Sequence, residues 1–229
     1  ARGRLWLEAA AGLRVEVVRL QVTLDDAFVR GDVTAVFSAE RTAIGDVVET
    51  TIERADTVWA HGVQPLVDGE NVLRLTVERP ELWWPNGEGD AACYTVRTKV
   101  LRRGAVVREL IREIGFKHIA WQPCTGAPPE ALPWLCVVNG RPLFLQGVNW
   151  TPPRMCYQDV TREETERLVT IYRDLGCNVL RVWGGGYLES PEFYAACDRA
   201  GLLVWQEFPL SSSGVDSRPP EDEAFLAEL

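Results

Sequence analysis

The sequence predicts two folded parts: an immunoglobulin-like β-sandwich, followed by the first three βα units of a (β/α)8 TIM barrel. Apolar residues alternate with period two in the first half of the chain, and helical periods with short apolar runs replace them in the second half. A proline-rich segment separates the two patterns. We therefore expect a sandwich at 1–118, an extended linker at 119–134 and an incomplete barrel at 135–229.

The composition is that of a soluble globular protein. With 229 residues, 46% hydrophobic and 25% charged, the chain is long enough for two medium domains. Its net charge of −9 argues against nucleic acid or an anionic membrane as a partner, because phosphate binding needs clustered Lys and Arg. A run of about 18 apolar residues, the length of a membrane span, does not occur.

The cysteines predict neither a metal site nor a disulfide framework. The six cysteines show no C-x-x-C motif and no metal-type spacing with the two histidines, and most lie in apolar runs. Free thiols mildly favour a reducing compartment such as the cytoplasm. The chain starts with neither a Met nor a signal-peptide pattern, so we expect its N-terminus to be a cut inside a longer polypeptide that leaves the compartment unknown.

The first half predicts about seven short strands. Turn residues such as Gly45-Asp46, Pro85-Asn86-Gly87 and Arg103-Gly104 separate the alternating runs, which is typical of a sandwich. No Cys…Trp…Cys pattern is present, so we expect a sandwich without the antibody disulfide. The clearest alternating runs are Val15–Val17, Val33–Phe37, Leu73–Val77 and Tyr94–Val100.

The second half predicts the order strand, helix, strand, helix, strand. A hairpin around Asn139-Gly140 leads into a core strand that ends near Asn149-Trp150. The capping box Thr161–Glu164 begins a helix that ends at Gly176. A second helix, with Ser190 as its N-cap and Pro191 at its first position, ends at Gly201. The βαβαβ order requires parallel strands with right-handed crossovers.

The strand ends favour a barrel over a dinucleotide-binding sheet. Polar or aromatic residues follow each of the three strands, as in barrel enzymes. A Rossmann sheet would carry G-x-G-x-x-G after its first strand, whereas Gly184–Gly186 has the wrong spacing and follows the second strand. Glycines allow close backbone approach and Trp offers a flat apolar face, a combination that suits a sugar ring better than a phosphate. The strand-end residues are Asn149, Trp150, Arg181, Trp183, Trp205 and Glu207.

These motifs resemble glycoside hydrolase family 2, and within it the β-mannosidase branch. The family signature is matched by Asn178–Arg181 and, after a loop, by Asp198–Trp205. The loop Val182–Gly186 is similar to the β-mannosidase version and differs from the His-Tyr-Pro type of galactosidase-like members. Further matches, in the family's order, are Leu82–Gly87, Ile114–Lys117, Val138–Gly140, Gly147–Pro152 and Val204–Phe208.

The resemblance implies a parent protein that is a retaining exo-glycosidase, without a cofactor, that removes terminal β-linked mannose from oligosaccharides or glycoconjugates. In the family the acid/base belongs to an Asn-Glu pair on barrel strand four and the nucleophile to strand seven. No Asn-Glu pair occurs in this sequence, so we expect no catalytic residue and no activity in the chain by itself. Its expected partners are a β-mannoside-type oligosaccharide and the remaining domains of the parent.

The resemblance also implies which residues line the sugar site. Trp183 and Trp205 would stack on or wall the pyranose, and Asn149 and Glu207 would contact its hydroxyls. Arg181 would orient a neighbouring carboxylate by bidentate hydrogen bonding. Structural roles remain open for each residue, above all a core position for Trp205 and an ion pair for Arg181.

Two other functions stay open from the sequence. The parent could be another family 2 glycosidase, of the endo-β-mannosidase or exo-β-glucosaminidase type. The chain could also be a carbohydrate-binding or structural fragment without catalysis.

Overall fold

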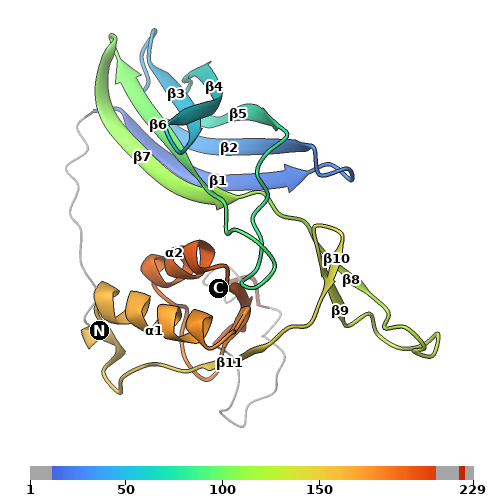
Figure 1. The fold of residues 1–229 in the computed structure, drawn as a ribbon. Coiled ribbons are helices and arrows are strands. Elements are labelled where there is room, and N and C mark those ends of the chain that lie inside the picture. The colour runs from blue at the N-terminus through green and yellow to red at the C-terminus, as the bar shows by residue number, and fades with distance from the viewer. Residues whose placement is uncertain (1–11, 210–221, 225–229) are drawn as a thin grey trace. The chain divides into compact units, whose positions relative to one another are not determined.

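The computed structural model describes residues 12–209 and 222–224 (Figure 1). These residues form two compact units. The first contains residues up to 84 together with 88–144, and the second contains residues 85–87 together with those from 145 onward.

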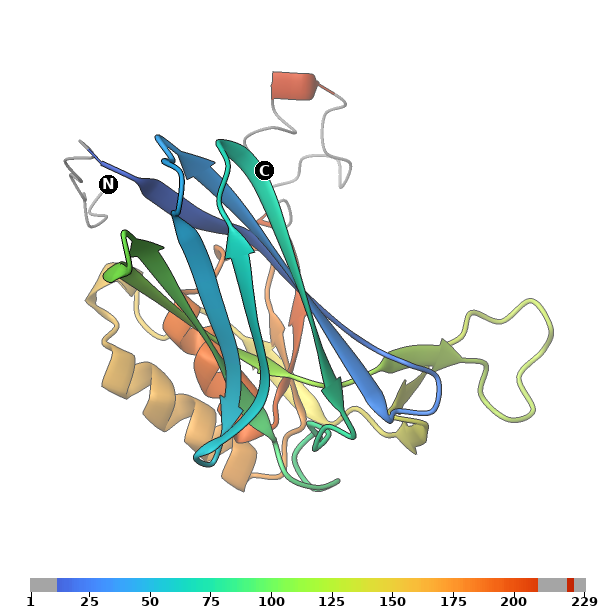
Figure 2. The same cartoon turned by 90° about the horizontal axis from the view of Figure 1, so that it is seen from above.

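The first unit is built on a β-sandwich, which can be followed in Figures 1 and 2. Its two antiparallel sheets have the strand orders β1-β2-β5 and β4-β3-β6-β7, so seven strands occupy the range in which the alternation predicts about seven. The strands are β1 Arg14–Leu24, β2 Arg30–Glu40, β3 Val47–Arg54, β4 Thr57–Pro65, β5 Gly69–Glu78, β6 Cys93–Arg102 and β7 Ala105–Gly115.

Alternating side chains of both sheets fill the sandwich core. In β6 every second residue is buried, from Tyr94 to Val100, as the sequence pattern predicts. The Tyr94 ring packs edge-on against Phe116 at a centroid distance of 5.0 Å. Thr50 and Thr98 face each other across β3 and β6, and their buried hydroxyl oxygens lie 2.9 Å apart. This hydrogen bond satisfies two polar groups that would otherwise be costly inside the core.

A small three-stranded sheet, β10-β9-β8, also belongs to the first unit. Asn139 and Gly140 adopt positive φ angles of 48° and 79° in the hairpin turn between β9 (Leu135–Val138) and β10 (Arg141–Leu143), which confirms the predicted hairpin. Strand β8 (Ile119–Gln122) corrects the expectation of an extended linker from 119, because it pairs with β9. The linker prolines begin only at Pro123, so the preceding residues keep the N–H groups that a strand needs. The other predicted domain bounds stay a prediction.

The second unit contains three parallel strands in the order β11-β12-β13. The described strands form an open sheet, and no closed barrel is seen in this part of the chain. Helices α1 and α2 connect the strands, which confirms the predicted βαβαβ order. The elements are β11 Gly147–Trp150, the short 3-10 helix η1 Tyr157–Asp159, α1 Arg162–Asp174, β12 Val179–Val182, α2 Pro191–Ala200 and β13 Leu203–Gln206.

The helix ends follow the predicted capping residues. The Thr161 hydroxyl accepts a hydrogen bond from the Glu164 N–H (3.2 Å), and Ser190 caps α2 in the same way through Phe193 (3.4 Å). Helix α2 ends at Gly201, whose φ of 72° is the left-handed conformation that glycine adopts most easily. In the described residues no helix is long and apolar enough to cross a membrane.

Candidate functional site

Three of the predicted site residues occupy one row of the parallel sheet. Asn149 on β11 pairs in register with Arg181 on β12, which in turn pairs with Trp205 on β13. Because residues paired in register point to the same face, these side chains are neighbours. They lie on the face opposite to Leu180 and Val182, which are buried in the apolar core with the helices.

Arg181 is the centre of this row. Its Nη1 donates a hydrogen bond to Oδ1 of Asn149 (2.8 Å). Its Nε donates to Oε1 of Glu207 (2.9 Å), and its Nη2 donates to the same oxygen. The guanidinium carbon also lies 5.7 Å from the centre of the Trp205 ring. One side chain therefore connects groups from all three strand ends.

Glu207, directly after β13, is held as an anion. Its second oxygen, Oε2, accepts the backbone N–H of Gly184 (2.9 Å). The hydrogen bonds from Arg181, and after them that from Gly184, hold the pKa of the Glu207 carboxyl below its ordinary value. At neutral pH this carboxylate can accept hydrogen bonds from hydroxyl groups, but it has no proton to donate.

Trp205 and Trp183 differ in their surroundings. Trp205 is 51% exposed within the described residues. Trp183 is partly buried, and its indole lies against the backbone of the loop that follows β12. A Cβ atom at Gly185 would come within 2.1 Å of Cζ2 of Trp183, so only glycine permits this contact. The structure thus unites Asn149, Arg181, Trp205 and Glu207, while Trp183 lies in the loop that Glu207 binds through Gly184.

A second carboxyl group in this region, that of Glu189, was not predicted. The indole Nε1 of Trp150 donates a hydrogen bond to Oε1 of Glu189 (2.8 Å). Burial raises the pKa of the Glu189 carboxyl, and the Trp150 donor offsets only part of that effect. Trp150 itself is buried, because strand alternation turns it to the side opposite Asn149. That alternation was a signal for Trp150, whereas nothing in the loop sequence distinguishes Glu189.

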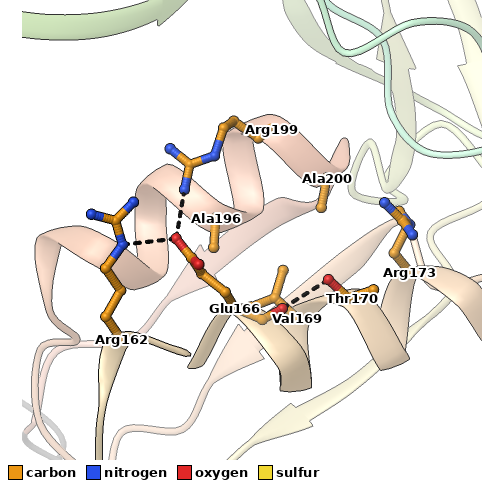
Figure 3. A pocket seen from close by; sticks show the side chains of 8 residues that line it. All are labelled: Arg162, Glu166, Val169, Thr170, Arg173, Ala196, Arg199 and Ala200. Carbon is orange, nitrogen blue, oxygen red and sulfur yellow. Dashed lines mark hydrogen bonds and ion pairs between the residues drawn. The ribbon is translucent and has the colours of Figure 1, made fainter. Parts of the chain in front are cut away.

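A polar pocket of about 290 Å³ lies between α1 and α2 (Figure 3). Glu166 of α1 accepts hydrogen bonds there from Arg162 (2.9 Å) and from Arg199 of α2 (3.2 Å). The carboxylate thereby connects the two helices, which is a structural role. The residues that line the pocket are Arg162, Glu166, Val169, Thr170, Arg173, Ala196, Arg199 and Ala200.

The structure places no metal-ligand cluster in the part of the chain that it describes. Within residues 12–209 and 222–224, no three or more His, Cys, Asp or Glu side chains are grouped to hold an ion.

Comparison with known proteins supports the resemblance drawn from the motifs. Beta-mannosidase from Rattus norvegicus is 32% identical over 193 residues, which cover 81% of this chain and 22% of that protein. Probable beta-mannosidase from Caenorhabditis elegans is 36% identical over 147 residues, covering 60% of this chain and 16% of that protein. The chain therefore spans about a fifth of the length of such relatives.

Solved structures show the same similarity. Beta-D-mannosidase from Dictyoglomus thermophilum superposes with a TM-score of 0.76 at 25% identity, covering 93% of this chain and 26% of that one. A β-glucuronidase from Parabacteroides merdae superposes with a TM-score of 0.72 at 20% identity, covering 90% and 26%, and shares the fold. Residues 13–117 match the family described as "Glycosyl hydrolases family 2". They therefore form a domain of glycosyl hydrolase family 2, as the sequence motifs predict.

Proposed function

We propose that the chain is part of a retaining exo-glycosidase that removes terminal β-linked mannose from oligosaccharides or glycoconjugates. The identity to proteins named beta-mannosidase supports this proposal, since it extends over 193 residues and hence beyond the sandwich. The β-mannosidase-like loop Val182–Gly186 lies in the same second unit as the Arg181 row.

The proposal includes a finer description of the fold. The strand orders β1-β2-β5 and β4-β3-β6-β7 support an immunoglobulin-like sandwich. The parallel strands β11, β12 and β13, with helical crossovers, support the first three βα units of a (β/α)8 barrel. In such a barrel, ligands bind at the carboxyl ends of the strands. Asn149, Arg181 and Trp205 lie near the carboxyl ends of their strands.

The observation that carries the proposal is the chemistry gathered around Arg181. Asn149 offers an amide and Glu207 an anionic acceptor, and both are suited to the hydroxyl groups of a pyranose. The exposed Trp205 indole offers a flat surface for the apolar face of the ring. Arg181 holds the amide and the carboxylate in fixed positions, so that little side-chain entropy is lost when a sugar binds.

In this proposal the described residues bind the sugar, and the bond-breaking groups lie elsewhere in the full-length protein. Retaining hydrolysis requires one carboxyl group as acid/base and a second as nucleophile, about 5–5.5 Å apart. The lowered pKa of Glu207 is unsuited to a general acid at neutral pH. Glu207 instead orients a hydroxyl group of the substrate.

Kinetics of the full-length protein on chromogenic substrates test the function. The set contains β-mannoside, β-glucoside, β-galactoside, β-glucosaminide and β-glucuronide. We expect the highest kcat/KM on the β-mannoside, with release of β-mannose as the first product in NMR. A preference for β-glucosaminide would favour the alternative family 2 activity, and no turnover of any substrate would favour the non-catalytic one.

A further inference from the structure

One buried residue, Trp150, binds both ends of the loop between β12 and α2. Its carbonyl oxygen accepts the backbone N–H of Trp183 (3.1 Å), at the start of the loop. Its indole Nε1 donates to Oε1 of Glu189 (2.8 Å), at the end of the loop. These two hydrogen bonds therefore anchor both ends of the segment 183–189 to Trp150, the last residue of β11.

Trp150 is a rigid point of attachment. Only 3% of its surface is exposed, and its ring packs against Phe193 (4.7 Å between centroids) and Tyr172 (5.9 Å). A side chain packed in this way has one orientation, so its N–H direction is fixed. The position of the Glu189 carboxyl is therefore set by the core of the unit.

The middle of the loop is fixed from β13. Glu207 accepts the Gly184 N–H (2.9 Å), and the Gly186 N–H closes a turn on the Trp183 carbonyl (3.0 Å). The Trp183 indole rests on Gly185, as described above. The position of that indole consequently depends on the shape of the loop, and the loop depends on Trp150 and Glu207.

We propose that Glu189 is a positioning residue for the sugar site: by accepting the Trp150 indole N–H it fixes the β12–α2 loop, and with it Trp183, in the conformation that binds the substrate. This inference rests on the function proposed above. Glu189 acts through the loop, whereas Glu207 belongs to the site itself. No bond to the substrate is required of Glu189.

The first test compares variants of the full-length protein on a chromogenic β-mannoside. We expect Glu189→Ala to raise KM about tenfold with kcat changed less than threefold, because the loop that the Trp150–Glu189 hydrogen bond fixes would then have to be ordered by the substrate, at a cost comparable to one hydrogen bond. Glu189→Gln should restore most of the affinity, because its amide oxygen can accept the same N–H. The matched control is Glu192→Ala, an exposed glutamate in the first turn of α2.

The second test is amide hydrogen exchange, which needs no enzymatic activity. We expect Glu189→Ala to accelerate exchange in peptides covering 183–190, with unchanged exchange in β6 and α1, while Glu189→Gln and Glu192→Ala resemble the wild type. If the wild type fails to cleave β-mannosides but the loop responds in this way, the proposed function fails and the loop-fixing role of Glu189 stands.

Two results would overturn the inference. One is wild-type KM and wild-type loop exchange in Glu189→Ala. The other is faster exchange throughout the second unit at unaltered KM, which identifies a general stabilising residue. If Glu189→Ala does not fold, Trp150→Phe removes the donor and retains a ring. Faster exchange confined to the loop in that variant supports the inference, and faster exchange throughout the second unit overturns it.

Discussion

Arg181 and Glu207 are joined through a single carboxylate oxygen, which accepts hydrogen bonds from both Nε (2.9 Å) and Nη2 of the guanidinium. The other oxygen of Glu207 accepts the Gly184 N–H. The planar guanidinium fixes the direction of the carboxylate and simultaneously reaches Asn149. The sequence left an ion pair or a site role open for Arg181, and this geometry combines an ion pair with the positioning of two groups that we propose to bind sugar.

Replacing Arg181 by lysine should impair the proposed site. One ammonium group cannot reproduce the three directed donors that reach Asn149 and Glu207. We expect Arg181→Lys in the full-length protein to lower kcat/KM on a β-mannoside about 10- to 100-fold, the equivalent of one hydrogen bond to a charged group. The matched control is Arg162→Lys, because Arg162 is an exposed residue of α1 in a surface ion pair, and this change should have little effect. Equal losses in the two variants would contradict a role for Arg181 in the site.

The stability contribution of Glu207 should depend on pH. Its pKa in the folded protein is lowered, so the contribution is fully present above the unfolded-state pKa of about 4.3 and is lost as pH falls through the folded-state value. We expect the difference in urea midpoint between wild type and Glu207→Gln to be constant from about pH 7 to 5 and to shrink below about pH 4. A difference that grows on acidification would show that the carboxyl is favoured in its protonated form.

Local patterns predicted the strands and helix ends because each depends on a few neighbouring residues. Alternation identified the strand that contains Tyr94–Val100, and capping chemistry identified Thr161 and Ser190. The strand at Ile119–Gln122 was missed because its pairing partner, β9, lies beyond the prolines. The sequence of these four residues carries no clear strand pattern, so the adjacent prolines determined the prediction of a linker.

The sequence allowed the strand-end residues of the candidate site to be named, but not the hydrogen bonds of the loop beside it. Asn149, Arg181 and Trp205 could be placed at strand ends, and parallel register then brings them together. The Trp150–Glu189 hydrogen bond depends on how a seven-residue loop folds back across the sheet, and no periodicity encodes that path. Tertiary contacts of loops are set by the elements they meet, which sequence spacing does not reveal.

The buried pair Thr50 and Thr98 offers a test of the sandwich core. Thr50→Val leaves the buried Thr98 hydroxyl without its hydrogen-bond partner, which lies 2.9 Å away in the wild type, and we expect a loss of about 1–3 kcal/mol of unfolding free energy. The double variant Thr50→Val/Thr98→Val removes both polar groups and should recover most of that loss. Urea unfolding of the four proteins measures the coupling, and strictly additive losses would contradict a direct hydrogen bond.

The 229-residue chain by itself should not hydrolyse glycosides. In our proposal the acid/base and the nucleophile lie outside it, and Glu207 is bound to Arg181 and kept as an anion. Incubation with β-mannoside, β-glucoside and β-galactoside should give no turnover above a blank. Activity that copurifies with the chain and disappears in Glu207→Gln would instead assign a catalytic role to Glu207.

Gly185 provides the sharpest test of Trp183. An alanine Cβ at Gly185 would lie 2.1 Å from Cζ2 of Trp183, so the indole has to move, although the backbone at this glycine does not need a positive φ. At the control position Gly186, the nearest atoms are the Trp183 carbonyl oxygen at 3.2 Å and Pro152 at 3.5 Å, which a small shift accommodates.

We therefore expect Gly185→Ala and Trp183→Ala to lower kcat/KM on a β-mannoside in the full-length protein to a similar extent. A lost stacking surface of about 1–3 kcal/mol, by analogy with base–aromatic stacking, corresponds to roughly 5- to 150-fold. Gly186→Ala should stay within about threefold of the wild type, since it leaves the indole in place. If Gly185→Ala and Trp183→Ala keep wild-type kinetics and only lower the melting temperature, Trp183 is a packing residue, and the proposed β-mannoside specificity loses the residue that distinguishes this loop.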